Sequence, residues 1–186
     1  GIDAHAMLPK FTSFGERLFG KLTMNTSIKG GLNDTLGFDN RGLNGQGRVN
    51  IQDGTLTGVK ANKTIASLVK LPDLEAINFK DWTNSFSIAD GRVIIKDLRI
   101  AALGGDYLVN GSQGLDGSMD YSMSMLLSDK ASAQVSIPGF AGEAVQLFKE
   151  PGGRVKLDFS VGGTYDDPKV HLDTKPAQKK AEDLAK

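Results

Sequence analysis

The sequence has no cysteine and only two histidines among its 186 residues. Without cysteine the chain forms no disulfide bond and no thiolate metal site, and two histidines argue strongly against a tetrahedral zinc site. Proline is scarce, with six residues, and no apolar run approaches the ~20 residues of a membrane-spanning helix. The composition therefore excludes a disulfide-stapled scaffold and argues against a proline-rich disordered chain.

An excess of charge of one sign is also missing. The 22 Lys and Arg residues balance 22 Asp and Glu residues, so the formal net charge is zero. Since phosphate neutralisation supplies most of the affinity of a nucleic-acid binder, the balance argues against DNA or RNA as a partner. Aromatic residues are few, whereas glycine is plentiful at 23 residues, which is typical of many turns between short strands.

Two Asp-Gly pairs predict β-hairpins. Asp53-Gly54 separates alternating runs at 47–52 and 55–59, and Asp90-Gly91 separates similar runs at 85–89 and 92–96. Both residue types tolerate the positive φ that a two-residue hairpin turn requires.

The longest alternation lies between residues 118 and 128. One side of it carries Met119, Tyr121, Met123, Met125 and Leu127, and the other side is rich in serine. Such a pattern predicts a strand with one dry face. Further strands are expected at 106–111, 155–161 and 169–173.

Three segments predict helices. Apolar residues at steps of three or four indicate a helix over 8–22, on the residues Leu8, Phe11, Phe14, Leu18 and Leu22. A second helix follows a cap at Asn62 and ends before Pro72, and a third begins at Pro138 and ends before Pro151. The predicted fold is α+β and β-rich, a curved antiparallel sheet of about eight strands with two or three short helices packed on one face.

The domain division follows from composition. Residues 1–7 are interpreted as an expression-tag remnant and left out of the fold prediction. Residues 8–173 form one predicted domain, and 174–186 are a polar tail that is either a solvated helix or disordered.

No reactive constellation is evident. Outside residues 1–7 the only histidine is His171, expected on the polar side of a strand, and Asp166 and Asp167 precede a proline in a predicted turn. We therefore predict no enzymatic activity, no cofactor and no metal site.

The remaining candidate site is apolar. A methionine-rich face is soft and suits varied apolar ligands, although methionine also fills gaps in closed cores. A core beneath a helix and a groove for acyl chains both fit the pattern. The candidate lipid-contacting residues are Met119, Tyr121, Met123, Met125, Val155, Leu157 and Phe159.

Four stretches, in this order, resemble the carboxy-terminal region of the AsmA family. They are the run from Leu43-Asn44-Gly45-Gln46-Gly47 to Val59, the run from Phe86 to Leu98, the run from Val109-Asn110-Gly111 to Tyr121, and Val161-Gly162-Gly163-Thr164 with Asp167-Pro168-Lys169-Val170. The similarity extends from about Leu22 to Asp173. The resemblance therefore implies that the predicted domain at residues 8–173 is an AsmA-like C-terminal domain.

The resemblance implies a non-enzymatic periplasmic module of a Gram-negative envelope protein, anchored to the inner membrane by a helix that lies outside this fragment. It implies a part in phospholipid transport and outer-membrane assembly, with phospholipid acyl chains and other envelope proteins as partners. The alternative is a structural or protein-interaction domain of the envelope with a closed core and no lipid site.

Overall fold

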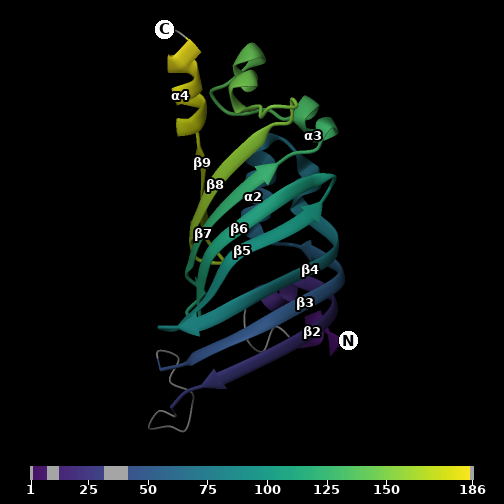
Figure 1. The fold of residues 1–186 in the computed structure, drawn as a ribbon, viewed down its shortest axis with the longest axis vertical. Helices are drawn as coiled ribbons and strands as arrows, with labels where there is room; N and C mark the ends of the chain where they lie inside the picture. The colour runs from purple at the N-terminus through teal and green to yellow at the C-terminus, as the bar shows by residue number, and fades with distance from the viewer. Residues whose placement is uncertain (1, 8–12, 32–41, 185–186) are drawn as a thin grey trace.

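The computed structural model describes residues 2–7, 13–31 and 42–184. Its centre is one curved antiparallel sheet whose nine strands lie side by side in the order of the sequence (Figure 1). The strands are β1 (Ile2–Asp3), β2 (Leu18–Lys29), β3 (Asn44–Thr57), β4 (Ala76–Ala89), β5 (Arg92–Ala102), β6 (Gly105–Gly114), β7 (Met119–Leu126), β8 (Lys156–Gly163) and β9 (Pro168–Asp173). The predicted fold class is confirmed. The sheet has one strand more than the eight expected, and β1, with two residues, is the shortest of the nine.

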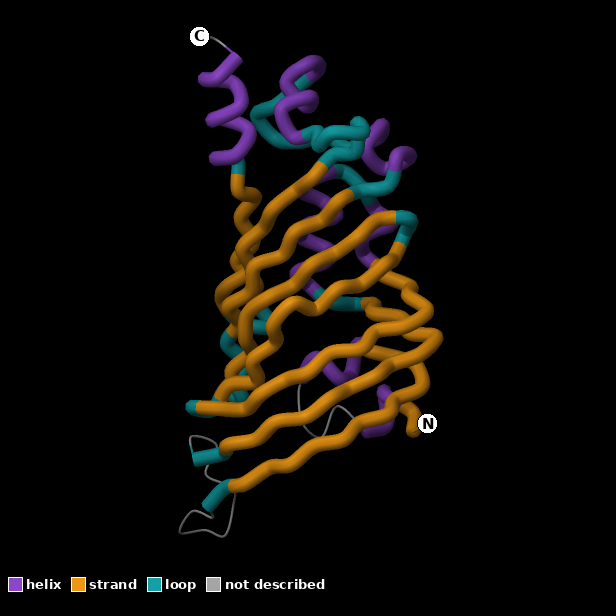
Figure 2. The backbone as a smooth tube through the Cα atoms, in the orientation of Figure 1, coloured by secondary structure: helices purple, strands orange, loops and turns teal. Residues whose placement is uncertain are grey.

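Short helices accompany the sheet. Within the described residues they are α1 (Ala4–Met7), α2 (Lys60–Val69), α3 (Asp129–Gln134) and α4 (Lys175–Leu184), with 3-10 helices η2 (Ser13–Arg17), η3 (Pro72–Glu75) and η4 (Gly142–Phe148). The tube drawing separates two groups: α2 lies behind the sheet in this view, whereas α3, η4 and α4 gather at one end of it (Figure 2).

Alternation along the strands places the core on one side of the sheet. Leu22, Ile51 and Trp82 are register partners across β2, β3 and β4, and all three are buried. Ile65 and Val69 of α2 belong to the same apolar cluster. We call this side the inner face and the opposite, more polar side the outer face.

The helix predicted over 8–22 is wrong in its described second half. Residues Ser13–Arg17 form η2, and β2 begins at Leu18. Leu18 and Leu22 still share a face, because a step of four residues is two strand periods as well as about one helical turn. Leu8 and Phe11 lie outside the described residues.

The two Asp-Gly pairs behave differently. Asp90 and Gly91, with φ of 51° and 69°, join β4 to β5 as predicted. The hairpin predicted at Asp53-Gly54 is wrong, since β3 continues through both residues and pairs on either side of them. Asp53 has a φ of 50° and, with Gly54, faces the single residue Gly20 of β2, which is a β-bulge.

The predicted helix at Asn62 is confirmed, but its cap is Val59, and Asn62 lies buried inside α2. A helix beginning at Pro138 is wrong. Pro138 and Gly139 form a turn between the paired residues Ile137 and Phe140, and Gly139 has a φ of 79°. The chain becomes helical only at η4, whose Phe148 is buried.

Both ends of the chain contribute to the structure. Ile2 pairs with Leu22, and Ala4 is fully buried, so the first residues belong to the fold even though their origin in a tag stays a prediction. At the other end α4 buries Ala177 and otherwise exposes most of its residues. The strands predicted after residue 105 are confirmed as β6 to β9.

Candidate functional site

The sheet register brings the predicted lipid-contacting residues together on the inner face. Met125 of β7 pairs with Leu157 of β8, Met123 pairs with Phe159, and Tyr121 pairs with Val161. On the other side of β7, the same three residues face Tyr107, Val109 and Gly111 of β6. The sequence alternation thus identified one continuous apolar surface.

Burial divides this surface into two parts. Met125, Val155, Leu157 and Phe159 are between 0% and 3% exposed, so they pack inside the core. Met119, Tyr121 and Met123 are half-buried. The four core residues have a structural role as the molecule stands, and their contact with lipid stays a prediction.

The half-buried apolar surface continues onto strands that the sequence analysis did not include. Its further members lie on the inner face of β2 to β6. Together with Met119, Tyr121 and Met123 they form what we call the open stretch, completed by Met24, Val49, Phe86, Ile95 and Val109. The period of two around Val49 and Phe86 was the signal that pointed to them, but the sequence did not show that their side chains, most of which pack against the core, stay partly exposed.

One amide group interrupts the apolar character of this region. Asn84 pairs with Val49 across β3 and β4, and its Nδ2 atom is buried without a hydrogen-bond partner among the described residues. Such a donor costs free energy unless something accepts its hydrogen bond.

The two tyrosines of the inner face are neutral at physiological pH. Burial raises the pKa of Tyr121 to about 12, against a smaller lowering effect of the Arg92 guanidinium. Burial also raises the pKa of Tyr107 to about 12, and the neighbouring Asp106 carboxylate adds to this. The open stretch therefore carries a phenol without a negative charge, which suits an apolar ligand.

The side chains considered for chemistry lie elsewhere. His171 is exposed on β9, where it pairs with Ser160. Asp166 binds Lys60 at 3.2 Å and Asp167 binds Lys169 at 2.8 Å, so both carboxylates form exposed ion pairs at the β8–β9 turn. In the described ranges no three His, Asp or Glu residues gather in a way that would hold a metal ion.

Comparison of the chain with protein-family models, curated proteins and solved structures finds no match. The fold itself defines the class of the protein, a β-rich α+β domain built on one curved meander of strands. None of the helices in the described part of the chain is long and apolar enough to cross a membrane.

Proposed function

We propose that this domain is a non-enzymatic lipid-handling module whose open stretch contacts phospholipid acyl chains. The observation that supports it is the row of half-buried apolar residues across six neighbouring strands, β2 to β7, on the face opposite the polar one. Following the resemblance to the AsmA family, we propose that it works in the periplasm as part of an inner-membrane-anchored protein involved in phospholipid transport and outer-membrane assembly.

The dimensions are suitable for an acyl chain. Five spacings of about 4.8 Å between six strands give the open stretch a contour of roughly 24 Å. One acyl chain spans half of a hydrocarbon core ~30 Å thick, or about 15 Å. Each methylene removed from water contributes about 0.8 kcal/mol, so the surface has no need of selective contacts to retain a chain.

A structural or interaction domain is the second candidate, and a different observation favours it. Among the described residues, β1 pairs with only two residues of β2, which leaves the edge of β2 from Thr23 to Lys29 without a strand neighbour. Exposed edges of this kind pair readily with strands of other proteins. In that case the inner face serves only as a core.

Lipid binding by the purified protein tests the proposal. Native mass spectrometry should reveal co-purified phospholipid, and the protein should take up a fluorescent phospholipid from vesicles. If neither occurs, the lipid site is refuted for this domain and the interaction domain remains.

Charge substitutions on β7 then locate the site. Met123→Asp places a carboxylate in the open stretch and should abolish uptake, because an unpaired charge cannot be covered by an acyl chain. Ser122→Asp is the matched control, since Ser122 is the exposed neighbour on the outer face. Trp82 fluorescence shows whether each variant folds, and Val49→Ser provides a milder substitution if Met123→Asp unfolds the protein. Uptake that survives Met123→Asp and Val49→Ser in folded protein would argue for a site elsewhere.

The absence of catalysis is part of the proposal and has its own test. The His171→Ala variant should match the parent protein in esterase and phosphatase screens, because His171 is exposed and, among the described residues, only Ser160 pairs with it in the strand register. A hydrolytic activity that disappears with His171 would contradict it.

A further inference from the structure

The outer face carries a hollow of about 680 Å³ at the ends of β2 to β5, on the side of the sheet away from the open stretch. Its polar lining includes two cations and several neutral side chains that are able to donate or accept hydrogen bonds. These are Arg48 and Lys96, with Asn25, Gln46, Ser85 and Ser87. Ile94 adds apolar surface to the wall, and Phe86, a member of the open stretch by its register, also borders the hollow.

The strand register explains how these side chains converge. Asn25, Arg48 and Ser85 form one cross-strand row, and Gln46 and Ser87 are partners in the next row. Side chains directly opposite each other on neighbouring strands have Cβ atoms about 5 Å apart. The row therefore places Arg48 and Ser85 within reach of one small group.

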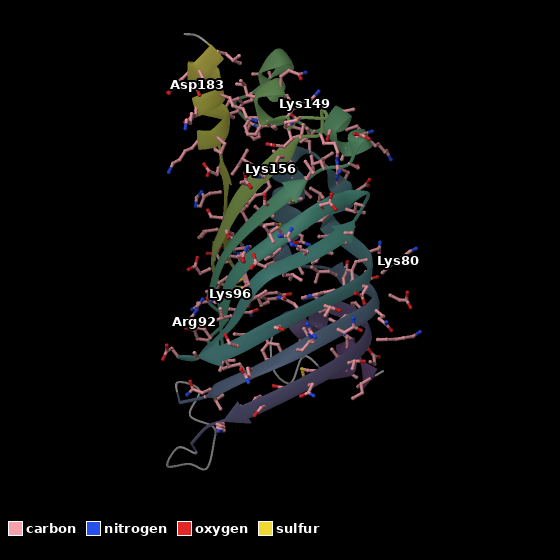
Figure 3. All side chains as sticks on the ribbon, in the orientation of Figure 1. Lys80, Arg92, Lys96, Lys149, Lys156 and Asp183 are labelled. Atoms are coloured by element: carbon pink, nitrogen blue, oxygen red, sulfur yellow. The ribbon has the colours of Figure 1, made fainter. Side chains whose placement is uncertain are left out.

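An interruption between β4 and β5 brings Lys96 to the same place. The two strands pair at Phe79↔Ala102 and again, in the same register, from Phe86↔Ile95, but their residues between these two points do not pair. Lys96 stands at a bulge of β5, where Asp97 has a φ of 51° and its N–H donates to Asn110 Oδ1 at 2.7 Å. Figure 3 labels Lys96 beside Arg92, near the end of β5 that follows the β4–β5 turn.

The charge of the hollow is of one sign. No carboxylate is among its lining residues, and neither Arg48 nor Lys96 takes part in any of the ion pairs formed by the described residues. Asp81, four residues before Ser85, is engaged by Asn50 at 2.6 Å. A second hollow on the same face, of about 450 Å³, has mixed charge, with Asp81, Arg99 and Asp106 in its wall.

We propose that the first hollow binds a phosphate group carried on a hydroxyl-rich molecule, such as a glycerol phosphate. Arg48 and Lys96 would bind the phosphate oxygens through charge-assisted hydrogen bonds, and the serine, asparagine and glutamine side chains would bind its hydroxyl and ester oxygens. Because the formal net charge of the whole chain is zero, the surplus of cations is a property of this hollow and not of the surface in general. This site is independent of the acyl-chain site, because it lies on the other face of the sheet.

Glycerol 3-phosphate is the soluble probe, and vesicles of phosphatidylglycerol or phosphatidylcholine are the membrane probes. Calorimetric titration should detect glycerol 3-phosphate binding that glycerol alone does not reproduce. Arg48→Gln and Lys96→Gln should each weaken it by about tenfold or more, whereas Arg99→Gln, in the mixed-charge hollow, should not. Vesicle flotation with the same variants shows whether the phosphate belongs to a lipid headgroup.

The two probes and the three variants distinguish a free phosphate ligand, a lipid headgroup and no phosphate site. Binding of the soluble probe that Arg48→Gln and Lys96→Gln weaken supports a free phosphate ligand. Flotation with phosphatidylglycerol alone, weakened by the same two variants, supports a headgroup ligand. Binding that is absent with both probes, or that Arg99→Gln weakens equally, overturns the proposal. If a variant does not fold, amide NMR shifts of Ser85 and Ser87 in the parent protein replace it, and unmoved signals at saturating glycerol 3-phosphate overturn the proposal as well.

Discussion

Alanine substitutions at Met125 and Met123 provide a quantitative test of the division of the inner face into a closed core and an open stretch. Met125 is 2% exposed and lies between Tyr107 of β6 and Leu157 of β8, which are also buried. Met123 is two residues earlier on the same strand and face, but it is half-buried. The two positions therefore differ mainly in how far the rest of the chain covers them.

The expected magnitudes follow from this cover. Met125→Ala removes a fully packed side chain and leaves a cavity, which lowers the free energy of unfolding by about 3 kcal/mol. Met123→Ala loses only part of that transfer free energy and leaves no closed cavity, so about 1 kcal/mol is expected. With an m-value of about 2–3 kcal/mol/M, the urea midpoint falls by roughly 1–1.5 M for the first and 0.3–0.5 M for the second.

Urea unfolding followed by tryptophan fluorescence measures both. Trp82 is the only tryptophan, and it is 6% exposed on the inner face of β4, so its emission reports loss of the core. Ser122→Ala, exposed on the outer face, is the control and should change stability by less than about 0.5 kcal/mol. Equal losses at Met123 and Met125 would refute the division, because both residues would then be equally enclosed.

Three further measurements probe other parts of the structure. Arg154→Ala should lower the free energy of unfolding by about 2–3 kcal/mol in the same urea assay, because the guanidinium donates to Leu127 O at 2.6 Å and to Leu126 O at 3.0 Å. Full stability in the variant would show that these two hydrogen bonds contribute little. Gly20→Ala should cost about 1–3 kcal/mol, since Gly20 has a φ of 134° and an added Cβ would lie 2.9 Å from Gln52 O, and an unchanged urea midpoint would contradict the bulge geometry. In a pH titration the native state should lose stability as the pH rises from about 10, the pKa of tyrosine in the unfolded chain, towards 12, the raised pKa of Tyr121 in the folded protein. Tyr121→Phe should reduce this loss of stability. An identical pH profile in both proteins would count against the burial of the phenol.

The contrast between the two Asp-Gly pairs shows what local sequence can and cannot predict. Both aspartates adopt a positive φ, of 50° at Asp53 and 51° at Asp90, so the local conformation was predictable. Whether the chain then turns back depends on its neighbours. Leu56 beyond Asp53-Gly54 has partners on both sides, Leu18 of β2 and Ile77 of β4, so the strand continues through a bulge. No residue within the 47–59 segment carries that information.

The candidate site shows the same limit at a larger scale. Alternation placed Met119 to Met125 and Val155 to Phe159 on one face, which is a local property of extended chain. Burial along that face depends on where α2 lies, and α2 comes from a segment between β3 and β4. Its contact with the rest of the fold, such as Lys60 with Asp166, joins residues 106 positions apart. The sequence therefore predicted the surface, but not which part of it is covered.

The two proposed sites share strands, and apart from Phe86, which borders both, they are formed by different residues. Arg48, Ser85 and Lys96 of the phosphate site each precede or follow a residue of the open stretch, namely Val49, Phe86 and Ile95. Since neighbouring side chains of a strand point to opposite faces, a substitution on one face leaves the other face in place. Lys96→Gln should therefore leave the uptake of fluorescent phospholipid unchanged, and Met123→Asp should leave the affinity for glycerol 3-phosphate unchanged. If Lys96→Gln reduced acyl-chain uptake in folded protein, the two ligands would have to be parts of one lipid that reaches both faces, and the interruption between β4 and β5 would be the passage to examine.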